Sequence, residues 1–177
     1  MQSDIRGELV ALLPRLRRFA YALTGSLDEA DDVVQTVCER ALTRLDQFQP
    51  GTRLDSWLFR IAQTTWIDRV RSLRRRDASG EPELMENIGY DARIHEQTEA
   101  RSALEIVRVA TARLPEEQRS VLALVVVDGM SYAEAAEVLQ VPIGTIMSRL
   151  ARARKKLAAA LESPAAASDM TGSEPAT

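Results

Sequence analysis

Cations and hydroxyl groups gather on one side of a helix predicted over residues 143–161. At about 100° per residue, an apolar stripe occupies one face of this helix. The opposite face has no acid and carries Thr145, Ser148, Arg149, Arg152, Lys155 and Lys156. Lysine and arginine bind phosphates, and arginine and hydroxyl groups also reach base edges in the major groove. The pattern therefore predicts a helix that binds duplex DNA.

A second predicted helix, over residues 131–139, comes directly before it. Ser131 and Glu134 have the spacing of a capping box, which marks a helix start. Pro142 then ends the short turn between the two helices. A basic helix face by itself is more often a solvated surface. The capped helix and the turn complete a helix-turn-helix pattern, which favours DNA binding over that alternative.

A second basic cluster ends a long helix predicted over residues 54–76. Its members are Arg69, Arg71, Arg74, Arg75 and Arg76. The helix also carries Trp57, which we assign to the core, and Trp66, which fits either the core or the surface. An exposed aromatic ring beside arginines can stack on an unpaired base while the arginines bind phosphates. Alternatively, the arginine cluster serves only to increase the solubility of the protein.

The helix predicted over residues 27–46 has an acidic stripe opposite its apolar side. This stripe consists of Asp28, Asp32, Gln35 and Glu39. Negative charge repels DNA but complements a basic protein surface. A partner-binding surface and a merely solvated face explain the stripe equally well.

The chain has 177 residues and a net charge of −3, an average that hides the separation of basic and acidic segments. Helical periodicity and the lack of β-type alternation predict an all-α protein of two small domains. The domains span residues 1–76 and 98–161, with the helix-turn-helix in the second. An acidic, flexible linker (77–97) joins them and a disordered tail (162–177) follows. Helices are predicted over residues 3–24, 27–46, 54–76, 98–113, 115–127, 131–139 and 143–161.

The chain contains one cysteine, Cys38, and one histidine, His95. No disulfide can form within the chain, and these two residues build no metal cluster. We expect Cys38 to be a small buried hydrophobe and His95 to be solvated in the linker. No signal peptide or membrane-spanning run is found. These features predict a cytoplasmic protein without a cofactor or membrane contact.

Three segments together resemble bacterial RNA polymerase sigma factors of the sigma-70 family, in the extracytoplasmic-function (group IV) class. YALTGSLDEADDVVQTVCERAL resembles region 2.1–2.2, and LDSWLFRIAQTTWIDRVRSLRRR resembles regions 2.3–2.4. The segment from Leu114 to Leu157 resembles region 4. The match covers about residues 5–76 and 100–161 in the order of the family. Met147 stands where many members of the family carry Arg or Lys, and Thr64 stands where many carry Asn. The resemblance therefore does not indicate which promoter sequence the chain recognises.

The resemblance implies a role for each pattern. The acidic stripe would bind the clamp helices of the polymerase β′ subunit, and the β flap would be a further contact. The helix over 54–76 and the loop 47–53 would bind flipped bases of the −10 element. The helix over 143–161 would read the −35 element, and an anti-sigma factor would be a further partner.

Other functions explain less of the chain. A sigma-like decoy that sequesters an anti-sigma factor has no need of the two basic clusters. A helix-turn-helix regulator that binds only duplex DNA leaves residues 5–76 without a role. An enzyme is the weakest alternative, because one histidine, one cysteine and no glycine-rich phosphate loop offer little for a catalytic site.

Overall fold

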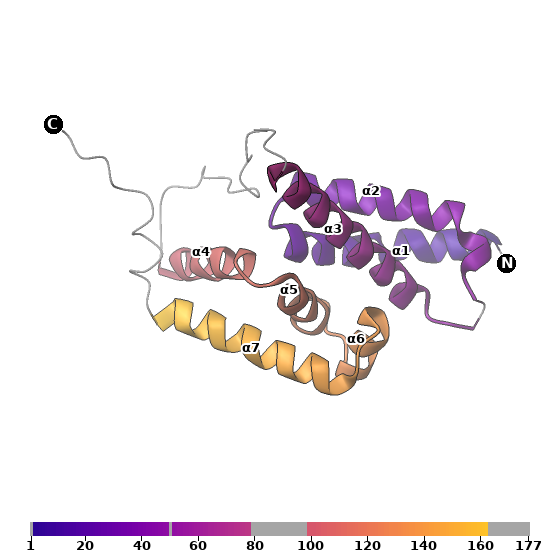
Figure 1. Ribbon diagram of the computed structural model, residues 1–177. Coiled ribbons are helices and arrows are strands. Elements are labelled where there is room, and N and C mark those ends of the chain that lie inside the picture. The colour runs from indigo at the N-terminus through magenta and orange to yellow at the C-terminus, as the bar shows by residue number, and fades with distance from the viewer. Residues whose placement is uncertain (1, 50, 79–98, 163–177) are drawn as a thin grey trace.

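The computed structural model describes residues 2–49, 51–78 and 99–162 (Figure 1). These ranges consist of helices and turns and include no strand, which confirms the all-α prediction. Nearly all of the predicted linker and tail, together with His95, lies outside the described residues. We call residues 2–78 the first unit and residues 99–162 the second unit.

The first unit is a bundle of α1 (Gln2–Thr24), α2 (Leu27–Thr43) and α3 (Leu54–Ala78), with a short 3₁₀ turn at Leu45–Gln47. Gly25 ends α1 with a φ of 76°, a conformation that glycine adopts without strain. Pro14 lies inside α1, which continues through it as one helix. The predicted helix boundaries therefore hold to within a few residues.

Aromatic and branched side chains from all three helices fill the core of this unit. Phe19 of α1 meets Phe59 of α3 edge to face, with 4.9 Å between the ring centroids. Val33 and Val37 cover the same core from α2. Helical periodicity groups Val34 with Val37 on one face of α2, but Val33 is the buried residue and Val34 is half-buried.

The second unit consists of α4 (Glu99–Ala112), α5 (Glu116–Leu122), a π-helical turn η2 (Ala123–Val127), α6 (Tyr132–Leu139) and α7 (Ile143–Glu162). Pro115 precedes α5 and fits the first-turn position, where no backbone donor is needed. The helix predicted over 115–127 is thus two elements, because its last turn widens to π geometry. Helix α7 packs against α4, α5 and α6.

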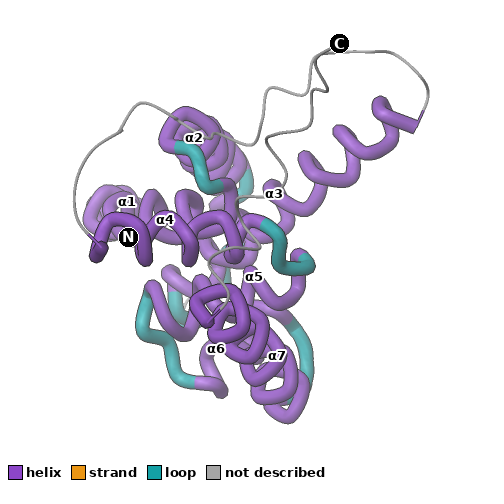
Figure 2. Tube along the Cα trace, turned by 90° about the vertical axis from the view of Figure 1, so that its left-hand side faces the viewer, coloured by secondary structure: helices purple, strands orange, loops and turns teal. Residues whose placement is uncertain are grey.

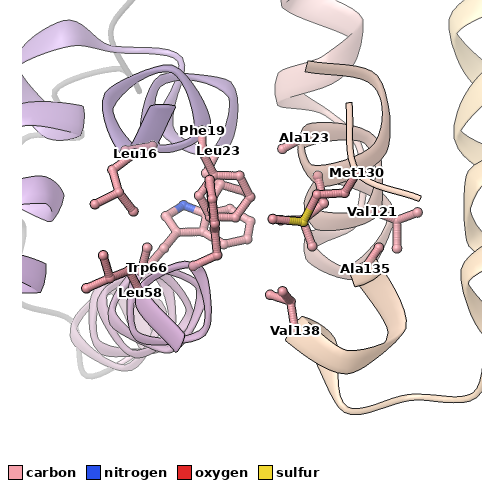
Figure 3. Packing of buried hydrophobic residues seen from close by; sticks show 14 of the residues in the cluster. Leu16, Phe19, Leu23, Leu58, Trp66, Val121, Ala123, Met130, Ala135 and Val138 are labelled. Atoms are coloured by element: carbon pink, nitrogen blue, oxygen red, sulfur yellow. The ribbon is translucent and has the colours of Figure 1, made fainter. Parts of the chain in front are cut away.

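The two units pack directly against each other. Helix α3 contacts α6, and α1 contacts α5 and η2 (Figures 1 and 2). Phe19, Leu23 and Trp66 of the first unit face Ala123 and Met130 of the second (Figure 3). One buried apolar cluster consequently runs through both units.

Charged side chains border this interface between the units. Arg15 of α1 donates to both carboxylate oxygens of Asp128, at 3.1 and 2.6 Å, and to Asp55 at 3.2 Å. Arg53 pairs with Asp55 at 2.7 Å and reaches Glu134 of α6. The Asp128 side chain is only 1% exposed, so its pairing with Arg15 offsets the cost of burying the charge.

Arg119 of α5 is the most deeply placed cation at the interface. Its guanidinium donates to the carbonyls of Leu23 at 2.9 Å, Leu114 at 3.3 Å and Ala112. It also lies over the Trp66 ring, 5.4 Å from the centroid. Burial lowers the pKa of Arg119 from its ordinary value. These contacts link α1, α3, α4 and α5 through one side chain.

We expect Asp55 to make stability depend on pH. Burial opposes its ionisation, but bonds from Arg53, the Ser56 N–H and Arg15 hold the Asp55 pKa below its ordinary value. A depressed folded-state pKa stabilises the fold above the unfolded value of about 4, and this contribution is lost as pH falls below it. Urea unfolding at pH 7 should show Asp55→Asn less stable than the natural chain, and the difference should shrink at pH 3. An equal difference at both pH values would contradict the assignment.

Candidate nucleic-acid interface

The helix-turn-helix is built by local hydrogen bonds. The Ser131 hydroxyl accepts from the Glu134 N–H at 3.2 Å, and the Glu134 carboxylate accepts from the Ser131 N–H at 2.8 Å. This confirms the predicted capping box at the start of α6. Gln140 ends α6 in the left-handed region, with φ 54° and ψ 45°. The turn then reaches Pro142, whose carbonyl accepts from the Thr145 N–H at 2.9 Å.

Helix α7 has the amphipathic character that its sequence predicts. Ile146, Leu150 and Ala153 are buried against the rest of the second unit, and Leu157 is half-buried. Ile143 and Leu161, at the ends of the predicted stripe, are 48% and 44% exposed because the packing covers only its centre. The buried centre fixes the rotation of α7 and so decides which residues face outward.

The predicted DNA-binding residues lie on the outward side of α7. Ser148, Arg152, Lys155 and Lys156 are exposed, whereas Thr145 and Arg149 are half-buried. Within the described part of the chain, no acidic side chain forms an ion pair with these cations. Figures 1 and 2 place α7 on the side of the second unit that is remote from the first unit. The exposed residues of this basic face are therefore open to a ligand.

Arg154 and Met147 are two further exposed residues of α7, although the helical period places both near its core flank. Met147 is 54% exposed, so its side chain extends outward beside the basic face. Arg154 adds another cation to the outer surface of α7. A helical wheel misses such residues because it does not show how far the neighbouring helices extend.

The acidic stripe of α2 is exposed along its length. Asp28, Asp32, Gln35 and Glu39 are all exposed. Gln35 donates to Glu39 at 3.1 Å, and Asp32 accepts from Arg69 at 3.4 Å. The stripe therefore borders the basic cluster of α3.

Trp66 is a predicted site residue that fitted either the core or the surface, and the structure places it in the core. It is 3% exposed and lies in the interface between the units, under Arg119. In this arrangement its ring is not available to a base. Trp57, assigned to the core, is half-buried against Phe48, with 5.4 Å between the ring centroids.

The arginines of α3 extend beyond Trp66. Arg71, Arg74, Arg75 and Arg76 are exposed and Arg69 is half-buried. Arg74 pairs with Glu116 of α5 at 2.7 Å. The arginines thus occupy the last turns of α3, where Arg74 contacts the second unit and Arg69 contacts α2, while the basic face of α7 lies elsewhere.

Neither a metal site nor a membrane-spanning helix stands out among the described residues. No group of three or more His, Cys, Asp and Glu side chains in the described ranges is arranged to hold a metal ion. None of the described helices has the length and apolar content to cross a bilayer. Cys38 is half-buried, and burial followed by the nearby Glu39 charge raises the pKa of its thiol.

Comparison with known proteins identifies the class that this fold and these surfaces define. The family descriptions "Sigma-70 region 2" and "Sigma-70, region 4" match residues 9–76 and 104–157. A curated relative, the ECF RNA polymerase sigma factor EcfG of Rhodopseudomonas palustris (strain TIE-1), is 39% identical over 165 residues. That alignment covers 91% of this chain and 87% of the relative.

Two solved structures share the fold. The sigma factor RpoE in complex with the anti-sigma factor NepR, from Bartonella quintana, has a TM-score of 0.73 and 30% identity over 90% of this chain and 97% of that one. CnrH in complex with the cytosolic domain of CnrY has a TM-score of 0.67 and 27% identity over 92% and 90%. The chain belongs to the sigma-70 family of RNA polymerase sigma factors, in the extracytoplasmic-function class. It is an alternative sigma factor, in a family of transcription initiation factors whose partners are RNA polymerase and promoter DNA.

Gln140, at the turn of the helix-turn-helix, allows a direct test of the turn geometry. Gln140 adopts a positive φ, which costs a residue with a Cβ more than it costs glycine. Gln140→Gly should therefore raise the free energy of unfolding by about 0.5–1 kcal/mol, measured by urea unfolding. Gln47→Gly, at an exposed position without a positive φ, should not stabilise the chain. Equal effects of the two substitutions would contradict this geometry.

Proposed function

We propose that this sigma factor is a dissociable initiation subunit that recruits core polymerase, reads the −35 and −10 elements and nucleates promoter melting. It carries no catalytic chemistry of its own and acts in the cytoplasm. The observation that supports the proposal best is the exposed basic face of α7, which has no acidic partner among the described residues. Run-off transcription with purified core polymerase tests it, because the chain should start transcripts that core polymerase alone does not.

The −35 element is read as duplex DNA by α7. Thr145, Ser148, Arg149 and Arg152 lie toward the N-terminal half of the helix, where a recognition helix approaches base edges. Lys155 and Lys156 lie farther along and contact phosphates. Phosphate contacts fix the register of the helix, and base contacts give the sequence preference.

The −10 element is bound by α3 and the loop before it. The arginine cluster Arg69, Arg71, Arg74, Arg75 and Arg76 binds the strand backbone. Trp66 is buried under Arg119 in this arrangement, so it stacks on an unpaired base only after the second unit moves away from its ring. Loop 47–53 adds a further contact. Extruding a base costs a few kcal/mol, and stacking on an aromatic ring returns about 1–3 kcal/mol, so capture of the base favours melting.

Core polymerase is bound by the acidic stripe of α2, which complements a basic surface on the β′ clamp helices, and the β flap is a second contact. An anti-sigma factor is a further partner. Support for that partner comes from the similar sigma factor RpoE, whose solved structure is a complex with the anti-sigma factor NepR.

Removing one cation from α7 should weaken −35 binding. Arg149→Ala or Arg152→Ala should cost about 1–3 kcal/mol on a cognate −35 duplex, because each removes a contact to a base edge or its phosphate. Fluorescence anisotropy with a labelled duplex measures the loss. Arg113→Ala removes an exposed cation outside α7 and should change the affinity little. Unchanged binding by both α7 variants would remove this face from the −35 site.

Reversing one charge on α2 should weaken polymerase binding without unfolding the chain. Asp32→Arg places a cation in the stripe and breaks only an exposed ion pair, which contributes little to stability. A pull-down should then recover less β′ subunit than the natural chain does. Asp46→Arg is the matched control, since it makes the same charge change at an exposed residue outside the stripe. Undiminished recovery with Asp32→Arg would contradict the assignment.

A further inference from the structure

The outward residues in the first turns of α7 are small. Gly144, Ser148 and Ala151 are all exposed, and the exposed cations of the basic face begin only with Arg152. A helix with its side chains is about 10–12 Å wide, and the major groove is about 12 Å wide. A helix whose outward side chains are short therefore lies deeper in the groove. The N-terminal part of α7, which is the part of a recognition helix that meets base edges, has this shape.

Gly144 is not explained by the fold. It lies in the first turn of α7 without a positive φ, and an added Cβ atom would meet nothing within 4 Å among the described residues. Glycine makes a helix less stable than alanine does, so this position costs stability without a gain in conformation or packing. Glycine is also used where a ligand closely approaches the backbone. Close approach of a ligand to the first turn of α7 accounts for it.

An exposed methionine lies beside this glycine. Met147 follows Gly144 by three residues, so the two are neighbours on the helix surface, and Met147 is 54% exposed. Ile143, one turn before it, is 48% exposed. Single exposed apolar residues are common, but these two lie together beside the cations assigned to the −35 duplex. Methionine is long and unbranched, so its side chain is able to reach over the open space at Gly144.

The apolar feature that duplex DNA presents in the major groove is the 5-methyl group of thymine. An apolar side chain that contacts this methyl group distinguishes thymine from cytosine, which has an amino donor and no methyl group there. Phosphates and guanine edges require a hydrogen-bond donor, which the side chains of Met147 and Ile143 do not have. The chemistry of this part of α7 therefore matches a thymine.

We propose that Met147 is a specificity-determining residue of the −35 site: its side chain contacts the 5-methyl group of a thymine, and Gly144 allows the base pair to approach the helix backbone. Ile143, on the adjacent turn, excludes water from this contact. The inference rests on the proposed function and adds to it the kind of base that the N-terminal end of α7 selects.

Removal of single methyl groups from the DNA tests the contact. The probe is the −35 duplex of a promoter that the chain transcribes, with each thymine replaced in turn by 2′-deoxyuridine, which lacks only the methyl group. Fluorescence anisotropy should show that one replacement weakens binding of the natural chain about three- to fourfold, the effect of burying one methyl group. Met147→Ala should bind the unmodified duplex more weakly and should bind the thymine and uracil duplexes equally.

Leu161→Ala is the matched control for Met147→Ala. Leu161 is an exposed apolar residue on the same flank of α7, roughly 21 Å farther along the helix. This variant should keep the full difference between thymine and uracil. A difference that persists unchanged in Met147→Ala assigns the methyl group to another side chain and overturns the proposal.

The same measurements separate this inference from the proposed function. If the natural chain binds the duplex and starts transcripts but responds to none of the uracil replacements, the thymine contact is wrong and the proposed function stands. If the natural chain binds no −35 duplex and starts no transcript, the proposed function is contradicted and the inference is overturned with it.

Gly144 provides an independent measurement that distinguishes a DNA contact from an effect on folding. Gly144→Ala should raise the urea midpoint of unfolding, because alanine favours the helix. It should nevertheless weaken −35 duplex binding about fivefold or more, because the added methyl group lies where the base pair approaches.

Gly7→Ala is the matched control for Gly144→Ala. Gly7 is also exposed in a helix without a positive φ, and an added Cβ atom would meet nothing within 4 Å in the described part of the chain. This variant should shift the urea midpoint in the same direction and leave duplex binding unchanged. Unchanged binding by Gly144→Ala, or an equal loss in both variants, overturns the proposal.

Discussion

The burial of Arg119 is the interaction on which the arrangement of this chain depends. The last carbonyls of an α-helix have no partner inside the helix and carry the negative end of its dipole. Arg119 donates to Leu23 near the end of α1 and to Ala112 at the end of α4, so one cation caps two helices from different units. The apolar contacts of Phe19, Leu23 and Met130 then close around it. The orientation of the units follows from these contacts.

Opposite charges are matched at the interface between the units and unmatched on α7. Arg15 with Asp128, Arg53 with Glu134 and Arg74 with Glu116 all join the two units. The net charge of −3 therefore hides basic and acidic segments that pair with each other across the interface. The electrostatic field that a polyanion encounters is set by the basic face of α7, whose cations have no acidic partner among the described residues.

The two basic surfaces of this chain, on α7 and on α3, are thus held in place differently. The α7 face is fixed by a small buried stripe centred on Ile146 and Leu150, and it does not depend on where the first unit lies. The α3 surface is different, because its aromatic residue belongs to the same buried cluster that joins the units. The α3 surface consequently depends on how the two units pack, whereas the α7 face does not.

The sequence by itself determined the features that follow from local periodicity and short-range capping. It predicted the helices to within a few residues, the Ser131–Glu134 capping box and the outward cations of α7, because each depends on neighbours within one or two turns. Only the tertiary structure decided that Trp66 is covered, that Arg74 pairs with Glu116 and that Arg154 is exposed. Those outcomes depend on residues far apart in the chain, and no helical period records which distant surface will lie against a given face.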